Sequence, residues 1–345
     1  MAFINFQPKD YFNTVLWSGN STGDNANQNI TGVGFQPDFF WNKSRNQAEN
    51  NIITDVLRGT NKFLRANDTT AEYTPTCNQT PISDGFTATG DEGGEFNNNG
   101  FTYATCNIKA NGAGSSNTDG SITSTVSANT TSGFSIVTWT GNSGSIGHGL
   151  GKKPAMLITK SLGASGGWYT THKSLGAEMQ DNYIFLNTSD ANSTNNDIWG
   201  GEPTTSTFSV GSGLIGNTTH VAYCFSPIKG FSAMGSYSGN GNADGAFIYT
   251  GFKPAWFLVK KSSASGEDWA IYDNKRNTFN EVDEALFPSA TTAETNVGDG
   301  LDFCSNGIKI RDSGGELNTS GATYIYMAFA ESPIVSSNGV PATAK

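Results

Sequence analysis

Charged side chains are scarce in this chain of 345 residues, at 14% of the sequence, and the 20 Lys and Arg are outnumbered by 30 Asp and Glu. The net charge of −10 argues against double-stranded nucleic acid as a partner, because neutralising phosphates requires clustered basic side chains. No apolar run approaches the roughly 18 residues of a membrane-spanning helix. Residues 1–5 lack the basic and apolar regions of a signal peptide. We therefore expect no nucleic-acid binding, no membrane insertion and no secretion signal.

Cysteine is rare as well. Cys77, Cys106, Cys224 and Cys304 are far apart and show neither CxxC spacing nor the density of a disulfide-stapled secreted domain. We expect all four to be reduced thiols that pack as small buried apolar side chains.

Only three histidines are present, His148, His172 and His220, and their separations of 24 and 48 residues match no zinc motif. The other two copies of the repeat described below have no histidine at these places. No Gly-rich segment has the Walker pattern of a phosphate-binding loop. The sequence therefore predicts no catalytic residue, no metal ion and no cofactor, and we expect the protein not to be an enzyme.

In place of charge, the chain contains 42 Gly together with many Asn, Ser and Thr, which favour turns over helices. It also has 22 Phe, 11 Tyr and 7 Trp, which provide ample apolar surface for building cores. This combination indicates a folded, β-rich protein, because a disordered chain would lack the aromatic residues.

The sequence repeats itself three times, and the first landmark is a short run that ends in an aromatic residue, a polar residue and Gly-Asn. It occurs as FNTVLWSGN at 12–20, as FSIVTWTGN at 134–142 and as GSYSGN at 235–240. Each run predicts a strand that enters a turn. The alignment predicts equivalent sites for Trp17, Trp139 and Tyr237.

The second landmark is Gly-x-x-Pro followed by an apolar run and a lysine, at 34–43, 151–160 and 251–260. Proline is tolerated at the start of a strand, where no ladder N–H is needed. Pro37, Pro154 and Pro254 should therefore open three equivalent strands. We expect these strands to be covered on both faces, and the lysine that follows each run to mark the exit of the strand to solvent.

A third landmark links the last two copies, in which Ala-Ser-Gly precedes Trp168 and Trp269. Its first residues, Ala164 and Ala264, are 100 residues apart. The two tryptophans are either core residues or exposed aromatics that contact a ligand.

A period near 100 residues matches a self-contained β-sandwich of short strands. The sequence therefore predicts an all-β chain of three tandem, jelly-roll-like β-sandwich domains with minimal helix. We place the domains at 1–110, 131–229 and 230–334, with a linker and possible extra strand at 111–130 and an extended tail at 335–345. The second and third domains should pack closely, because almost no linker separates them. The candidates for a short helix between strands are 50–64 and 281–287.

Acidic residues give weak signals. Glu95 lies in the glycine-rich loop 91–95, and Glu267 lies beside a tryptophan. Two such carboxylates in a groove could hydrolyse a glycosidic bond, but solvated loop residues are the preferred interpretation. Loop 240–245 is similar to the start of an EF-hand but has a single carboxylate, so a hairpin turn is preferred and calcium binding stays open.

One charge pair recurs, as Asp55-x-x-Arg58 and as Asp273-x-x-Arg276. It predicts a local salt bridge after a strand, worth about 0.2–1 kcal/mol if exposed.

The landmarks of the first copy resemble a known family. DYFNTVL from Asp10, GFQPDFFWNK at 34–43, Asp55-x-x-Arg-Gly and SDGF at 83–86 resemble modules repeated in virion proteins of marine tailed bacteriophages. The segments 125–137 and 148–151 and the closing YIYMAFAE at 324–331 are similar to the same family. The resemblance covers nearly the whole chain. It implies a structural phage protein of a tail fibre or another exterior part, with no enzymatic residues to carry over.

We therefore expect a non-enzymatic structural protein on the exterior of a tailed-phage virion, assembled in the host bacterial cytoplasm, that adheres to a host surface glycan or protein. Its expected partners are further copies of itself, with a trimer favoured, and other virion proteins. Two alternatives remain open. One is a capsid or tail decoration protein with a purely architectural role, and the other is a polysaccharide depolymerase.

Overall fold

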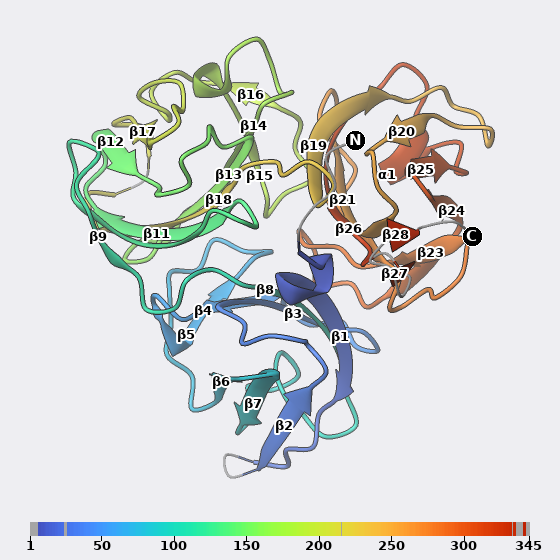
Figure 1. Ribbon diagram of the computed structural model, residues 1–345, viewed down its shortest axis with the longest axis horizontal. Coiled ribbons are helices and arrows are strands. Elements are labelled where there is room, and N and C mark those ends of the chain that lie inside the picture. Colours follow the sequence, from blue (N-terminus) through green and yellow to red (C-terminus); the bar gives the residue numbers. More distant parts are fainter. Residues whose placement is uncertain (1–5, 24–25, 215, 333, 336–340, 343–345) are drawn as a thin grey trace.

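The computed structural model describes residues 6–23, 26–214, 216–332, 334–335 and 341–342 (Figure 1). Its strands pair in antiparallel sheets, so the all-β prediction is confirmed. Helix in the described part of the chain is limited to the 3-10 turns η1 (Pro8–Asp10) and η2 (Met179–Asp181) and the four-residue helix α1 (Gly315–Asn318). No described helix is long and apolar enough to cross a membrane.

The strands form three lobes around a common centre (Figure 1). In the first lobe the sheet β1-β8-β3-β4-β5 and the sheet β2-β7-β6 enclose a core. In the second lobe the sheet β16-β15-β14-β13-β18-β11-β10-β9 and the pair β12-β17 do so. In the third lobe the sheets β19-β26-β21-β22 and β20-β25-β24-β23 enclose the core.

The first lobe contains β1 (Phe12–Ser18), β2 (Asn27–Thr31), β3 (Phe39–Ser44), β4 (Ile52–Asp55), β5 (Gly59–Arg65), β6 (Asn78–Ile82), β7 (Gly85–Thr89) and β8 (Thr102–Ile108). The second contains β9 (Ser115–Asn117), β10 (Ser124–Asn129), β11 (Phe134–Thr140), β12 (Gly144–Gly147), β13 (Met156–Ser161), β14 (Tyr169–His172), β15 (Asn182–Phe185), β16 (Ser193–Thr194), β17 (Thr207–Val210) and β18 (Thr219–Phe225). The third contains β19 (Ser232–Ser238), β20 (Phe247–Tyr249), β21 (Pro254–Lys261), β22 (Ala270–Asp273), β23 (Val282–Ala285), β24 (Thr295–Cys304), β25 (Gly307–Ile310) and β26 (Thr323–Ala330). A short pair, β27 (Ile334–Val335) with β28 (Pro341–Ala342), follows; the rest of the predicted tail lies outside the described residues.

The strand order of the first lobe is jelly-roll-like. The last strand, β8, lies between β1 and β3, while β7 lies beside β2 in the opposite sheet. The order departs from a jelly roll at β4 and β5, because both strands continue the first sheet.

The two predicted helices are wrong. Residues 50–64 form β4 and most of β5, and residues 281–287 contain β23. The β-branched residues Ile52, Ile53 and Thr54 pair with β3 and are fully buried, which a sheet accommodates better than a helix turn.

The aromatic residues of the first landmark occupy corresponding places in the three lobes. Trp17, Trp139 and Tyr237 are each the sixth residue of their strand and pair with the second residue of β8, β18 and β26. Each stacks on that partner, with ring centroids 4.5, 5.2 and 5.0 Å apart for Trp17–Tyr103, Trp139–His220 and Tyr237–Tyr324.

The prolines of the second landmark also occupy corresponding places. Pro37 and Pro154 come two residues before β3 and β13, and Pro254 is the first residue of β21. An irregularity after Pro254 restores the register, so that Phe39, Met156 and Trp256 face corresponding partners.

The predicted linker at 111–130 contains β9 and β10, which both join the large sheet of the second lobe.

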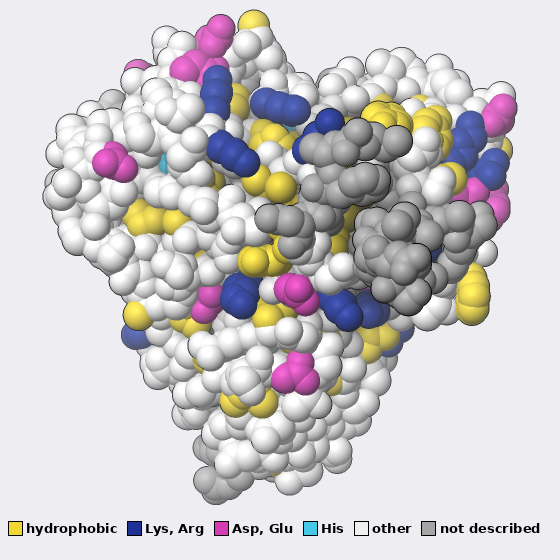
Figure 2. Space-filling model, viewed as in Figure 1, with side chains coloured by type: hydrophobic (Ala, Val, Ile, Leu, Met, Phe, Trp, Pro, Cys, Tyr) yellow, Lys and Arg dark blue, Asp and Glu magenta, His cyan; other side chains and the backbone are white. Residues whose placement is uncertain are grey.

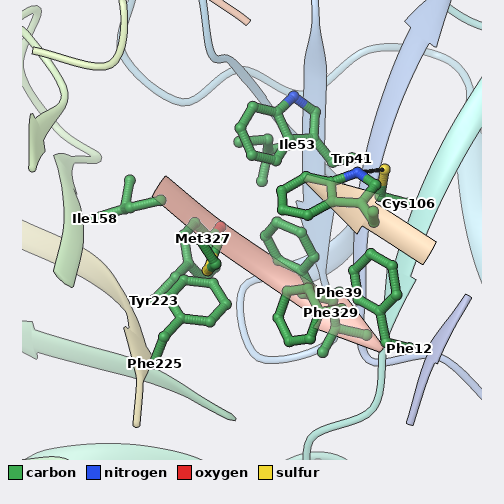
Figure 3. A pocket seen from close by; sticks show the side chains of 12 residues that line it. Phe12, Phe39, Trp41, Ile53, Cys106, Ile158, Tyr223, Phe225, Met327 and Phe329 are labelled. Carbon is green, nitrogen blue, oxygen red and sulfur yellow. Dashed lines mark hydrogen bonds between the residues drawn. The ribbon is translucent and has the colours of Figure 1, made fainter. Parts of the chain in front are cut away.

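The large sheets of the lobes meet in a shared apolar core (Figure 3). Aromatic rings touch across all three boundaries, with centroid distances of 4.7 Å for Phe39–Tyr223, 4.2 Å for Phe12–Phe329 and 6.5 Å for Phe225–Phe329. The cavity at this centre has a volume of about 10 Å³, room for at most one water molecule. It is therefore a packing defect and not a ligand site.

Candidate functional site

The two tryptophans considered as ligand contacts are enclosed between lobes. Trp168 and Trp269 have exposed fractions of 0% and 1%. Trp168 Nε1 donates to Arg65 O of the first lobe at 2.8 Å, and Trp269 Nε1 donates to Phe185 O of the second at 2.9 Å. Since neither ring has a face left for a ligand, the structure contradicts the ligand-contact alternative.

The first lobe has Asn51 at the corresponding place. Its Nδ2 donates to Phe287 O at 3.1 Å and to Ala290 O at 2.9 Å, both in the third lobe. The backbone amides of the three residues are held alike, by side-chain oxygens of Asn67, Asn187 and Ser289. At each boundary a side-chain N–H group thus donates to a backbone carbonyl of the adjacent lobe. The donor is the Asn51 amide at one boundary and a tryptophan indole at the other two.

The lysines that end the second landmark are buried at the same boundaries. Sequence analysis predicted that Lys43, Lys160 and Lys260 would leave the strand for solvent, and this is wrong, since their exposed fractions are 3%, 0% and 0%. Each ammonium donates to a carbonyl of the adjacent lobe: Thr291 O at 2.8 Å, Thr69 O at 2.9 Å and Ser189 O at 3.1 Å, respectively. Each also donates to a carbonyl of its own lobe, those of Glu49, Gly166 and Glu267.

Burial shifts the ionisation of these lysines. Loss of water contact disfavours the charged ammonium and lowers the pKa of Lys43, Lys160 and Lys260 to about 8. The two carbonyl partners remain bonded in either ionisation state, because a neutral amine still has two N–H donors. Each lysine therefore links a backbone carbonyl of its own lobe to a backbone carbonyl of the adjacent lobe.

The three lysine hydrogen bonds between lobes connect the lobes in a closed ring. The second lobe donates to the first, the third donates to the second, and the first donates to the third. The boundary between the first and third lobes is also bridged by the Arg45–Glu294 ion pair at 2.7 Å. Sequence analysis missed this boundary, although the threefold repetition of the lysine was a signal for it.

The recurring Asp–Arg pairs form the predicted local salt bridges, and both pairs are buried, so the energy range given for an exposed pair does not apply. Arg58 contacts Asp55 at 2.5 Å and Arg276 contacts Asp273 at 2.6 Å, with all four side chains at most 1% exposed. Asp55 also accepts a hydrogen bond from Tyr223 of the second lobe at 2.8 Å. The Asp55–Arg58 pair therefore lies at a lobe boundary, and Asp273 lines a small cavity together with Trp41 and Lys43 of the first lobe.

The three histidines act as structural groups in the second lobe. His148 Nδ1 accepts from the amide of Leu150, and His172 Nδ1 accepts from that of Ser174. Burial lowers the pKa of His172 to about 3, so this side chain is neutral at physiological pH. No group of three His, Cys, Asp or Glu in the described part of the chain could hold a metal ion.

The acidic residues considered for glycoside hydrolysis have basic partners. Glu95 contacts Arg65 at 2.8 Å and accepts a hydrogen bond from Tyr73 at 2.8 Å. Glu267 contacts Lys261 at 3.1 Å. Each carboxylate is thus held in an ion pair within its own lobe.

The polar side chains of loop 240–245 are exposed but make local contacts. Asn240 and Asn242 side-chain oxygens accept backbone amides two residues later, and Asp244 contacts Lys309 at 2.6 Å. These are the contacts of an Asx-type turn. The side-chain oxygens that would face a calcium ion are thus engaged by amides of the loop and by Lys309.

The largest exposed aromatic pair lies on β20, an edge strand of the third lobe. Phe247 and Tyr249 are 49% and 69% exposed, while Ile248 between them is buried in the core. Residues two apart on a strand project from the same face, so the two rings share the outer surface. The three consecutive apolar residues 247–249 were a signal for this strand in the sequence.

The aromatic pair is a property of the third lobe alone. The buried Ile30, Ile146 and Ile248 pair with corresponding residues of β7, β17 and β25. The positions flanking the other two isoleucines are Asn29 and Thr31 in β2, and Ser145 and Gly147 in β12. Figure 2 shows one face of the molecule, which is mostly uncharged with scattered basic and acidic side chains.

Comparison with known proteins gives a family. No curated protein and no solved structure matches the chain significantly. A family model described as "Domain of unknown function (DUF7483)" matches residues 7–333, which is nearly the whole sequence and includes all three lobes. The chain therefore belongs to the DUF7483 family.

Proposed function

We propose that the protein is a non-enzymatic structural component of a tailed-phage virion, displayed on the exterior, where it adheres to a glycan or protein of the host surface. The resemblance of the repeated landmarks to phage virion modules supports the virion assignment. Assembly would take place in the host bacterial cytoplasm, and self-association, with a trimer favoured, is part of the same proposal.

The observation that favours adhesion is the exposed pair Phe247 and Tyr249. Aromatic faces at the surface stack on the C–H faces of sugar rings, and Tyr adds a hydroxyl that can donate or accept. Asn240, Asn242 and Asp244 of the neighbouring loop 240–245 are exposed and form a polar border beside the two rings. Apolar platforms with a polar rim are typical of binding surfaces.

The buried ionisable groups support a structural role. The buried lysines, the Asp–Arg pairs and the histidines all hold backbone or side chains in place. The third lobe differs from the other two at its surface, where adhesion would occur, while its buried contacts follow the same plan.

The test measures binding of fluorescently labelled protein to a panel of marine bacterial cells and to their purified surface polysaccharides. The variant Phe247→Ser with Tyr249→Ser should lower binding by at least about tenfold, since each lost ring contact contributes about 1 kcal/mol. Leu16→Ser in the first lobe is the matched control, because Leu16 is also exposed, at 38%. Equal binding by both variants would refute the assignment of this surface.

Two further measurements separate the alternatives. Immunogold labelling of purified particles distinguishes a projecting adhesin from a decoration protein spread over the capsid or tail. Release of new reducing ends from the same polysaccharides would favour the depolymerase. Light scattering after size exclusion gives the oligomeric state.

A further inference from the structure

The three lobes differ in what lies beside the strand of the first landmark, which is β1 in the first lobe, β11 in the second and β19 in the third. In the second lobe β11 pairs with β18 on one side and with β10 on the other. In the first lobe the corresponding strand, β1, pairs with β8 alone among the described strands, so it is the edge of its sheet. Figure 1 shows β1 on the side of the first lobe that faces the third.

The position that β10 occupies in the second lobe is a groove in the first. Ser127 and Asn129 of β10 lie opposite Ile136 and Phe134. The corresponding residues of β1 are Thr14 and Phe12, because they pair with Cys106 and Ile108 as Ile136 and Phe134 pair with Tyr223 and Phe225.

Phe12, Asn13 and Thr14 line one side of a groove of about 220 Å³, and Ala255, Asn274 and Lys275 of the third lobe line the other. The groove is therefore the unfilled counterpart of a strand site.

The backbone of β1 presents hydrogen-bonding groups to this groove. Tyr11 O accepts from Lys109 N, and Gly19 N donates to Phe101 O, so these residues face β8. Backbone groups alternate along an antiparallel strand, which directs those of Phe12, Thr14 and Leu16 away from β8. An edge of this kind pairs with an added extended chain.

In the third lobe the corresponding strand, β19, also pairs with one neighbour, β26, among the described strands, and the chain turns tightly at its start. The amide of Ser232, the first residue of β19, donates to Ile228 O at 2.9 Å, and its hydroxyl accepts from the amide of Ile228 at 3.0 Å. Both β1 and β19 are therefore edge strands, and the edge of β1 lies beside the groove lined by Phe12, Asn13 and Thr14.

The charges along the groove define the partner. Its charged residues are Lys9, Lys275 and Glu331, and Glu331 forms an ion pair with Lys253. Lys9 and Lys275 are exposed and form no salt bridge with any described residue. The remaining positive charge favours a ligand with carboxylates.

We propose that this groove binds an extended acidic peptide segment of another protein, which adds to the sheet as a strand beside β1. The segment would occupy the place of β10, with small side chains near Thr14 and carboxylates near Lys9 and Lys275. This inference does not depend on the adhesion surface of β20.

The probe is a fluorescein-labelled peptide, DSTVSANE, which places acidic residues at both ends of the β10 sequence, and the control peptide is KSTVSANK. Anisotropy at low salt should show saturable binding of the acidic peptide, about tenfold tighter than the basic one. Added salt should reduce this preference. The variant Lys9→Glu with Lys275→Glu should reverse it, while Lys62→Glu, at the opposite edge of the same sheet, should leave it unchanged.

Proline substitution tests strand addition directly. Thr14→Pro removes an amide that faces the groove and leaves the ladder to β8 intact, so peptide binding should be lost. Because the Thr14 side chain is buried, Leu16→Pro on the exposed residue is the second variant. Circular dichroism checks that both variants are folded.

The proposal would be overturned by no binding of the acidic peptide at millimolar concentration, by equal binding of both peptides, or by binding that folded proline variants retain. Self-association of the chain that these proline variants abolish would also overturn it, because the occupant would then be a second copy.

Discussion

Replacing Trp168 with alanine should destabilise the protein by about 3–5 kcal/mol. The ring is fully buried between the first and second lobes, so its removal leaves a cavity in the boundary. The substitution also removes the 2.8 Å hydrogen bond to Arg65 O, which adds about 1 kcal/mol. Trp168→Phe keeps much of the apolar contact, so its cost should be roughly half as large.

Urea-induced unfolding followed by far-ultraviolet circular dichroism measures these costs through the midpoint at unchanged slope. Trp269→Ala should behave like Trp168→Ala, because it makes the corresponding bond to Phe185 O. Tyr249→Ala is the control: its ring is 69% exposed, so its effect should stay within about 0.5 kcal/mol. A loss below about 1 kcal/mol for Trp168→Ala would refute the reasoning that the ring is part of a packed boundary.

Three further predictions concern other buried groups. Arg276→Met should cost about 3–5 kcal/mol in urea unfolding, because it leaves the Asp273 carboxylate buried without its cation; a cost near zero would contradict this. Burial lowers the pKa of Lys160 to about 8, below the ordinary value of about 10.4. Between these two pKa values the unfolded chain binds the proton more tightly than the folded protein does. The free energy of unfolding of the wild type, relative to that of Lys160→Met, should therefore rise with pH by up to about 1.4 kcal/mol per pH unit. A difference that does not change with pH would contradict this. Of the cysteines, only the half-buried Cys304 should react with a thiol reagent in the native state; rapid reaction of the buried Cys77, Cys106 or Cys224 would show that their surroundings open.

The repeat in the sequence was sufficient to predict the all-β fold, because strand and turn signals are local. Trp17 and Pro37 could be placed with their counterparts for the same reason, since each marks a strand end. The two proposed helices failed where local pattern competes with pairing: Ile52 and Ile53 lie in a strand because β3 provides partners on a sheet buried on both faces.

The contacts between lobes could not be predicted from local pattern. A lysine after an apolar run ordinarily leads to solvent, and Lys160 is buried only because Thr69 O, 91 residues earlier in the chain, lies within reach. The partner of Lys43 is 248 residues away, across the boundary that closes the ring. The open edge of β1 is also invisible in sequence, because it follows from the absence of a β10 counterpart among the described strands.

The closed ring is the central claim, and hydrogen exchange with mass spectrometry on Lys43→Met tests it most directly. Lys43 donates to the carbonyl of Thr291 in the third lobe, so the substitution should speed exchange in β3 and β4 and also around Thr291. Lys62→Met is the control. Lys62 donates to Thr74 within the first lobe, so this substitution should affect the first lobe alone. Faster exchange in both the first and third lobes for Lys43→Met is the result that a closed ring predicts. Faster exchange confined to the first lobe would contradict it.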